Sequence, residues 1–94
     1  MKRLAYYTVE LASPDGGWGR LQELSADARR ASEQLTREGV AVRFVRSVFV
    51  PEDETCFYLY EAASADDVRE AVRRAELPFE LVSEAVEVSR GGGR

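Results

Sequence analysis

The chain contains no histidine and a single cysteine among its 94 residues. Histidine is the commonest protein ligand for zinc, copper and nickel, and one thiol is too few for a cysteine cluster. The usual ligand sets for these metals are therefore missing, and any metal site would have to be built from carboxylates. A single cysteine also excludes a disulfide within the chain.

Long hydrophobic runs are missing as well. No apolar stretch approaches the roughly 20 residues that a membrane helix needs, so we expect no membrane partner. The first fifteen residues, MKRLAYYTVELASPD, turn polar at Thr8 and acidic at Glu10 and so lack the apolar region of a signal peptide. We therefore expect a cytoplasmic protein.

A dominant positive patch is absent too, because 17 acidic residues outnumber 13 basic ones, for a formal net charge of −4. Nucleic-acid-binding proteins concentrate Lys and Arg against the phosphate backbone, so we expect no nucleic-acid partner. With 45% hydrophobic and 32% charged residues, the composition is that of an ordinary globular protein. We expect one domain over residues 1–89 and a disordered, glycine-rich tail at 90–94.

The first half of the chain predicts a strand, a helix and a second strand. Residues 4–11 alternate with apolar or aromatic side chains on both faces. Gly39 is suited to end the helix and Ser25 is one candidate for its N-cap. Residues 40–50 alternate again and put Phe44 and Arg46 on the same face. The helix itself is indicated by an apolar stripe at spacings of three and four: Leu21, Leu24, Ala28, Ala31 and Leu35.

The second half predicts the same three elements again. The turn Pro51-Glu52-Asp53-Glu54 precedes a strand over residues 55–62, which is rich in β-branched and aromatic residues. Ser64 then opens a helix, where its hydroxyl can cap the amide of Asp67. Residues 79–88 form the last strand.

The resulting order, βαββαβ, is typical of an α+β ferredoxin-like sandwich. We expect a four-stranded antiparallel sheet in the order 4-1-3-2, with two helices on one face. The other face would be uncovered, and an exposed apolar face usually marks a partner. Two copies could pack face to face into an α/β barrel, which predicts a homodimer. The candidates for the uncovered face are Tyr6, Thr8, Arg46, Val48, Tyr58 and Tyr60.

Five residues are candidates for a small-molecule site in or beside that barrel. Tyr58 and Tyr60 would line the cleft and offer hydroxyl groups, although a dimer core would use them equally well. Glu10 and Glu61 lie on strands beside apolar neighbours, and Arg46 is their natural counter-charge. An ion pair with no binding role is the alternative interpretation of these three charges.

Two further features have simpler interpretations than a functional site. Cys56 lies on a strand, where a small buried hydrophobic residue is the default, and no neighbouring residue supplies a base. The acids Glu52, Asp53 and Glu54 could bind a hard cation but are more typical of a solvated turn. We therefore assign no catalytic and no metal-binding residue.

Several short motifs together resemble the DUF4242 family of small bacterial proteins, described as nickel-binding and ferredoxin-like. The resemblance covers roughly residues 3 to 88 and implies a ferredoxin-like homodimer. It is carried by Val42-Arg43-Phe44-Val45-Arg46-Ser47-Val48, by Tyr60-Glu61-Ala62, and by Val68-Arg69-Glu70-Ala71 with Arg74-Ala75 and Pro78.

The family's metal-binding residues are not retained. Its W-V-H-S-Y motif places a histidine where this chain has Arg46, and its C-V-Y-E-A motif places a cysteine at Tyr58. A further family histidine matches Ala71. Cys56, two residues before Tyr58, is the only thiol that could compensate. Since nickel prefers imidazole and thiolate to lone carboxylates, we expect no metal or other cofactor.

Two functions remain open from the sequence. The first is a dimeric binding protein of the DUF4242 type, with a cleft for a small molecule or, less favoured, a metal. The alternative is a dimeric α/β-barrel enzyme, such as an isomerase, cyclase or cofactor-free oxygenase acting on a small aromatic or polyketide-like substrate, and it rests on fold analogy alone.

Overall fold

The computed structural model describes residues 3–12, 16–86 and 88, so the tail expected at 90–94 lies outside the described residues. The expected βαββαβ order is confirmed. The elements are β1 (Ala5–Ala12), α1 (Gly17–Arg37), β2 (Val42–Val50), the short 3-10 helix η1 (Pro51–Asp53), β3 (Thr55–Ala62), α2 (Ala65–Arg74) and β4 (Phe79–Ala85).

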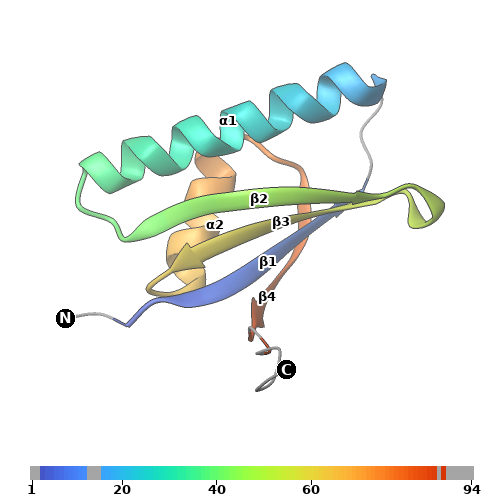
Figure 1. Cartoon of the computed structure of the whole chain (residues 1–94). Helices are drawn as coiled ribbons and strands as arrows, with labels where there is room; N and C mark the ends of the chain where they lie inside the picture. Colours follow the sequence, from blue (N-terminus) through green and yellow to red (C-terminus); the bar gives the residue numbers. More distant parts are fainter. Residues whose placement is uncertain (1–2, 13–15, 87, 89–94) are drawn as a thin grey trace.

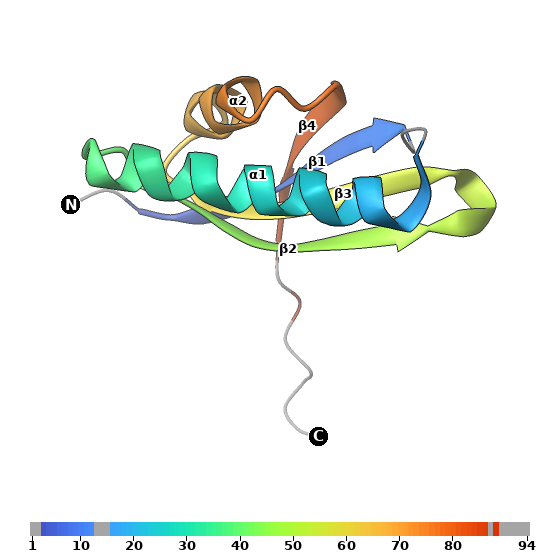
Figure 2. The same ribbon diagram turned by 90° about the horizontal axis from the view of Figure 1, so that it is seen from above.

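The four strands form one antiparallel sheet in the order β2-β3-β1-β4, which is the expected order read from the other edge. Both helices cover the same face, with α1 lying along β2 and α2 packing beside β4 (Figures 1 and 2). The opposite face, called the open face below, carries no helix. Neither α1 nor α2, the two helices of the described residues, is long and apolar enough to cross a membrane.

Helix α1 ends as the sequence predicts but begins earlier. Gly39 adopts a φ of 95°, which a residue without a Cβ accepts at little cost. Its amide donates to the carbonyl of Thr36 at 3.0 Å, and the amide of Val40 donates to the carbonyl of Leu35 at 2.9 Å. This pair of bonds is a Schellman motif. Ser25 is not the N-cap, because the helix already begins at Gly17.

Hydroxyl groups of α1 cover the outer edge of β2. The Ser32 side chain is buried, and its Oγ accepts a hydrogen bond from the amide of Phe44 at 3.3 Å. The Thr36 hydroxyl donates to the carbonyl of Val42 at 2.8 Å. An edge strand otherwise presents unpaired amide and carbonyl groups to solvent. Here the helix satisfies two of them.

Helix α2 begins as predicted. The Ser64 hydroxyl accepts a hydrogen bond from the amide of Asp67 at 3.1 Å, and Asp66 and Asp67 place negative charge at the positive end of the helix dipole. The buried side of the helix consists of Val68, Ala71 and Val72.

A β-bulge at Val45 reverses the facing of the second half of β2. Phe44 lies opposite Tyr60, but the next paired residue, Arg46, lies opposite Leu59, so Val45 has no partner of its own. A bulge inserts one residue and shifts the alternation by one. Phe44 therefore packs under the helices while Arg46 lies on the open face. The expectation that both share a face is wrong for this reason.

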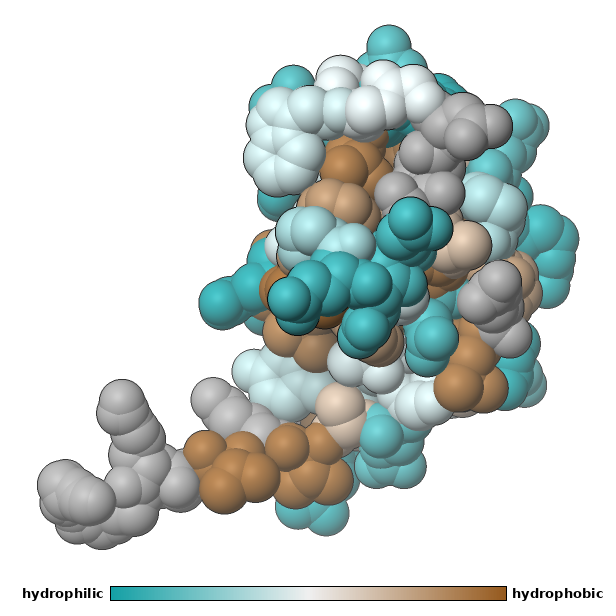
Figure 3. Space-filling view, turned by 90° about the vertical axis from the view of Figure 1, so that its right-hand side faces the viewer, coloured by the Kyte–Doolittle hydropathy of each residue, from teal (hydrophilic) through white to brown (hydrophobic). Residues whose placement is uncertain are grey.

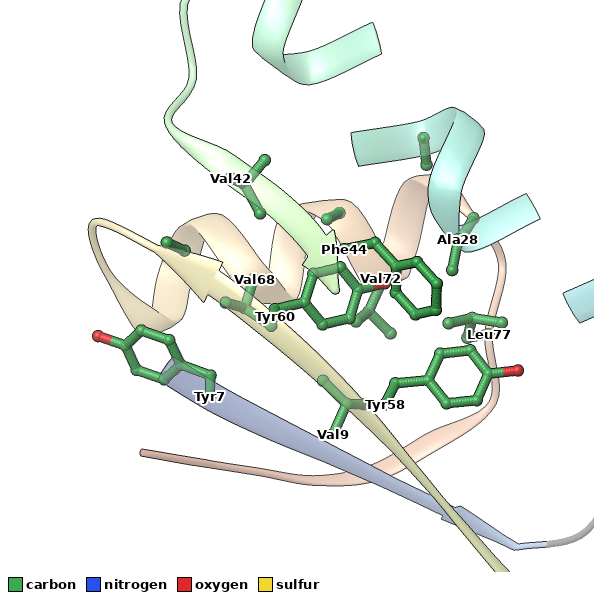
Figure 4. Close-up of a cluster of buried hydrophobic side chains, with 14 of the residues drawn as sticks. Tyr7, Val9, Ala28, Val42, Phe44, Tyr58, Tyr60, Val68, Val72 and Leu77 are labelled. Atoms are coloured by element: carbon green, nitrogen blue, oxygen red, sulfur yellow. The ribbon is translucent and has the colours of Figure 1, made fainter. Parts of the chain in front are cut away.

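The expectation that Tyr58 and Tyr60 lie on the open face is also wrong. Their side chains are 1% and 0% exposed and pack under the helices, where the Phe44 ring lies 5.6 Å from the Tyr58 ring and 5.5 Å from the Tyr60 ring, between centroids (Figure 4). Cys56 shares that buried face, as expected for a small hydrophobic residue.

Candidate functional site

The open face of the sheet has an apolar centre bordered by polar and charged residues. Leu59 occupies its centre and is half-buried, while Val48 is 50% exposed and Leu81 is 54% exposed. Tyr6 and Thr8 contribute from β1, as the sequence predicts. An apolar face of this kind on a domain with a single sheet is a common site for a partner.

A shallow hollow of about 270 Å³ lies on this face. The bulge forms part of its wall, because it turns Val45 and Arg46 toward the same side of the sheet. The hollow is lined by Tyr6, Val45, Arg46, Leu59, Ala85 and Val86.

The structure brings Glu10, Arg46 and Glu61 onto the open face but gives Glu61 a different partner from the one expected. Arg43, directly opposite on β2, donates to the Glu61 carboxylate at 2.9 Å. Within the described part of the chain, Arg46 forms no ion pair. The predicted pairing fails because Arg43 holds Glu61, while the bulge sets Arg46 opposite the apolar Leu59.

A second cavity, of about 410 Å³, lies on the helix side of the sheet and was not expected from the sequence. It opens between the first turns of α1 and the end of the β2–β3 hairpin, where Figure 3 shows hydrophobic atoms between the helix and the hydrophilic hairpin tip. We call it the helix-side pocket. Its lining residues are Trp18, Leu21, Gln22, Ser25, Ser47, Val48, Phe49, Cys56 and Tyr58.

Aromatic rings form the rim of the helix-side pocket. Trp18 is 66% exposed, and its ring lies 6.4 Å from that of Phe49, between centroids. The signal in the sequence for this pocket is Trp18, three residues before the apolar stripe of α1 begins at Leu21. The sequence pattern does not show the other half of the rim, because only the bulge turns Phe49 toward α1.

Hydroxyl groups form the polar part of the same pocket. The Ser25 and Ser47 hydroxyls lie 2.9 Å apart and link α1 to β2. The Tyr58 hydroxyl is buried and has no hydrogen-bond partner among the described residues. Burial raises the pKa of Tyr58, and the nearby Ser25 hydroxyl offsets that rise only in part. The two hydroxyls are close enough for Ser25 to affect this pKa, but they are not joined by a hydrogen bond.

The described residues do not fit a nickel ion. No three of their Asp, Glu and Cys side chains gather where they could share a metal. Burial raises the pKa of the Cys56 thiol, which disfavours the thiolate that metals bind. Arg46 is a cation on the open face and repels a metal ion there. The acids of the hairpin tip are exposed, as expected for a solvated turn.

Comparisons with known proteins match this chain to one family. The family model described as "Nickel responsive protein SCO4226-like" matches residues 7–85. Among solved structures, SCO4226 from Streptomyces coelicolor A3(2) is similar, with a TM-score of 0.69 and 19% sequence identity over 90% of this chain and 100% of that chain. At this identity the likeness shows the fold alone. No curated protein matches the chain. The DUF4242 label is not among these findings and stays a prediction.

Proposed function

The chain belongs to the SCO4226-like family, and from this premise we propose that it is a small homodimeric binding protein whose two copies meet through their open faces. The supporting observation is the sheet itself, which is covered by helices on one side only. Leu59, Val48 and Leu81 leave apolar area on the other side. Burying such area contributes about 25 cal/mol per Å².

We further propose that the dimer encloses a ligand cleft. A second copy would roof the shallow hollow beside Val45, which is open in a single chain. Arg46 lines this hollow and has no ion-pair partner in the described part of the chain, so a charge is available there. If dimerisation buried the Arg46 guanidinium without a counter-charge, the free energy cost would be large. The cleft therefore suits a small organic acid, with Glu10 and Glu61 elsewhere on the same face.

The family description mentions nickel, but the donors of this chain favour an organic ligand. Imidazole is missing from the whole sequence, and the only thiol is buried. Soft and borderline donors of these two kinds are what nickel prefers. The cytoplasmic location expected from the sequence stays a prediction.

The buried tyrosine and cysteine side chains do not support the alternative function, a barrel enzyme. Burial raises the pKa values of Tyr58, Tyr60 and Cys56, so these groups stay protonated at neutral pH and are unsuited to act as a base or a nucleophile. No other observation favours catalysis.

Light scattering tests the dimer. We expect the wild-type chain to have twice the mass of 10.5 kDa that one chain has. Leu81→Asp should shift the protein to monomer, because it places a charge in the interface. Ala26→Asp, on the exposed side of α1, is the matched control and should stay dimeric. A wild-type monomer at micromolar concentration would overturn the proposed packing.

Calorimetry with benzoate tests the cleft. Arg46→Gln should weaken benzoate binding about tenfold, because a hydrogen bond to a charged group is lost. Arg43→Gln is the matched control, since Arg43 lies on the same strand but already pairs with Glu61. Equal affinity of the two variants would show that Arg46 does not hold the acid.

A further inference from the structure

We propose that the helix-side pocket is a second binding site, specific for a neutral aromatic molecule that carries a hydrogen-bond acceptor. The pocket has a volume of about 410 Å³. This lies at the lower end of the range of about 300–1,000 Å³ for small-molecule sites. It therefore fits a small molecule rather than a peptide.

The walls select a flat apolar body. Trp18 and Phe49 present two rings at the rim, inclined by 58° to each other, and Leu21 extends the apolar surface from α1. Aromatic side chains favour stacked or edge-to-face contacts with another ring. An exposed tryptophan at the mouth gains contact area when such a ring enters.

The lining selects against charge. Its polar members are the hydroxyls of Ser25, Ser47 and Tyr58, the thiol of Cys56 and the amide of Gln22, so none of the described lining residues is ionised at neutral pH. A carboxylate or an ammonium group would find no counter-charge among the lining residues, since Arg20 and Asp27 act on Tyr58 from outside the lining, and its burial there is unfavourable. The site therefore differs in ligand class from the hollow beside Arg46.

The Tyr58 hydroxyl supplies the specific contact. It is a buried donor with no partner among the described residues, and it points away from Val9 and Tyr60 at the end of the core cluster (Figure 4). A buried hydroxyl without a partner is destabilising. A ligand oxygen that accepts a hydrogen bond from the Tyr58 hydroxyl would remove that penalty. The Ser25 and Ser47 hydroxyls, 2.9 Å apart, line the same pocket.

The proposal goes beyond the dimeric function and does not depend on it. Every lining residue comes from a single chain, and all of them except Val48, which is exposed at the edge of the open face, lie on the helix side of the sheet. A monomeric protein would keep this pocket unchanged.

Acetophenone and benzoate are a matched pair of probes, since they share ring and size but differ in charge. Trp18 is the only tryptophan, so its indole N–H gives a single resonance that reports on the rim in a proton–nitrogen spectrum of the full chain. We expect acetophenone to shift this resonance saturably. Benzoate should leave it unchanged.

Two phenylalanine variants separate the role of the hydroxyl from general stability. Tyr58→Phe and Tyr60→Phe each remove a buried hydroxyl without a partner, but only Tyr58 lines the pocket. Acetophenone should bind Tyr58→Phe about tenfold more weakly and Tyr60→Phe as it binds the wild type. Equal affinities for both variants, equal shifts with benzoate, or no saturable shift with acetophenone would each overturn the proposal.

Discussion

The hydroxyl of Tyr60 lies in the core without a hydrogen-bond partner among the described residues. Folding removes this hydroxyl from its hydrogen bonds with water and provides no protein partner, so the hydroxyl lowers the free energy of unfolding. We expect Tyr60→Phe to raise that free energy by about 1 kcal/mol in urea unfolding at neutral pH. A loss of stability would show that the hydroxyl is engaged after all.

The same variant should change the dependence of stability on alkaline pH. Burial raises the pKa of Tyr60 in the folded chain. Above about pH 10 the unfolded tyrosine loses its proton while the folded one keeps it, so stability falls as pH rises. Tyr60→Phe should flatten this fall above about pH 10, where the unfolded tyrosine ionises and the folded one does not. An unchanged slope would contradict the inferred pKa shift.

Nickel should bind no better than it does to any acidic surface. The chain has no histidine, its one cysteine is buried, and Arg46 puts a positive charge on the open face. Calorimetry should therefore show only weak heats that disappear with added salt. Stoichiometric binding at low micromolar nickel would reveal a carboxylate site outside this reasoning.

The face of the sheet on which a single residue lies was predictable for β1 but not for β3. The open-face position of Tyr6, Thr8 and Glu10 followed from alternation, but that of Tyr58 and Tyr60 did not. Both faces of β3 carry aromatic or apolar side chains, so alternation alone leaves the inner face undecided. Cys56 and Ala62 share the parity of the two tyrosines and, as small residues, pointed to the correct face.

At the scale of elements, the C-terminal end of α1 depends on Gly39. Its φ of 95° is unfavourable for a residue with a Cβ, although open space surrounds the position. Gly39→Ala should therefore lower the free energy of unfolding by about 1–2 kcal/mol. Gly19→Ala is the matched control: it lies inside α1 with no positive φ and no close neighbour, and should stabilise by about 0.5 kcal/mol.

The elements themselves were predictable because caps and periodicity are local. Gly39 and Ser64 marked helix boundaries by chemistry that acts within four residues. The bulge at Val45 was not predicted. Alternation in VRFVRSVFV does break at Phe44-Val45, where two apolar residues are adjacent, but a strand with apolar residues on both faces gives the same pattern. A bulge is decided by what the partner strand and the helix accept, and that information lies elsewhere in the chain.

At the scale of the whole molecule, the sheet separates two surfaces of different chemistry. The open face carries Arg46, Glu10 and Glu61 around an apolar centre. The helix-side pocket carries hydroxyls and rings and no described charge. The order of the elements predicted the uncovered face, because two helices on one side of a single sheet leave its other side without a cover. It could not predict the pocket, which forms where two segments distant in sequence meet.

The hydroxyls by which α1 covers β2 also limit how the protein can polymerise. Fibre growth by strand pairing needs two available edges per molecule, one to receive a neighbour and one to offer to the next. Ser32 and Thr36 occupy two outward groups at the start of the β2 edge, so β4 is the edge that α1 leaves more open to a neighbour. Strand pairing is therefore favoured between two β4 edges, and such a contact gives a closed pair rather than a filament.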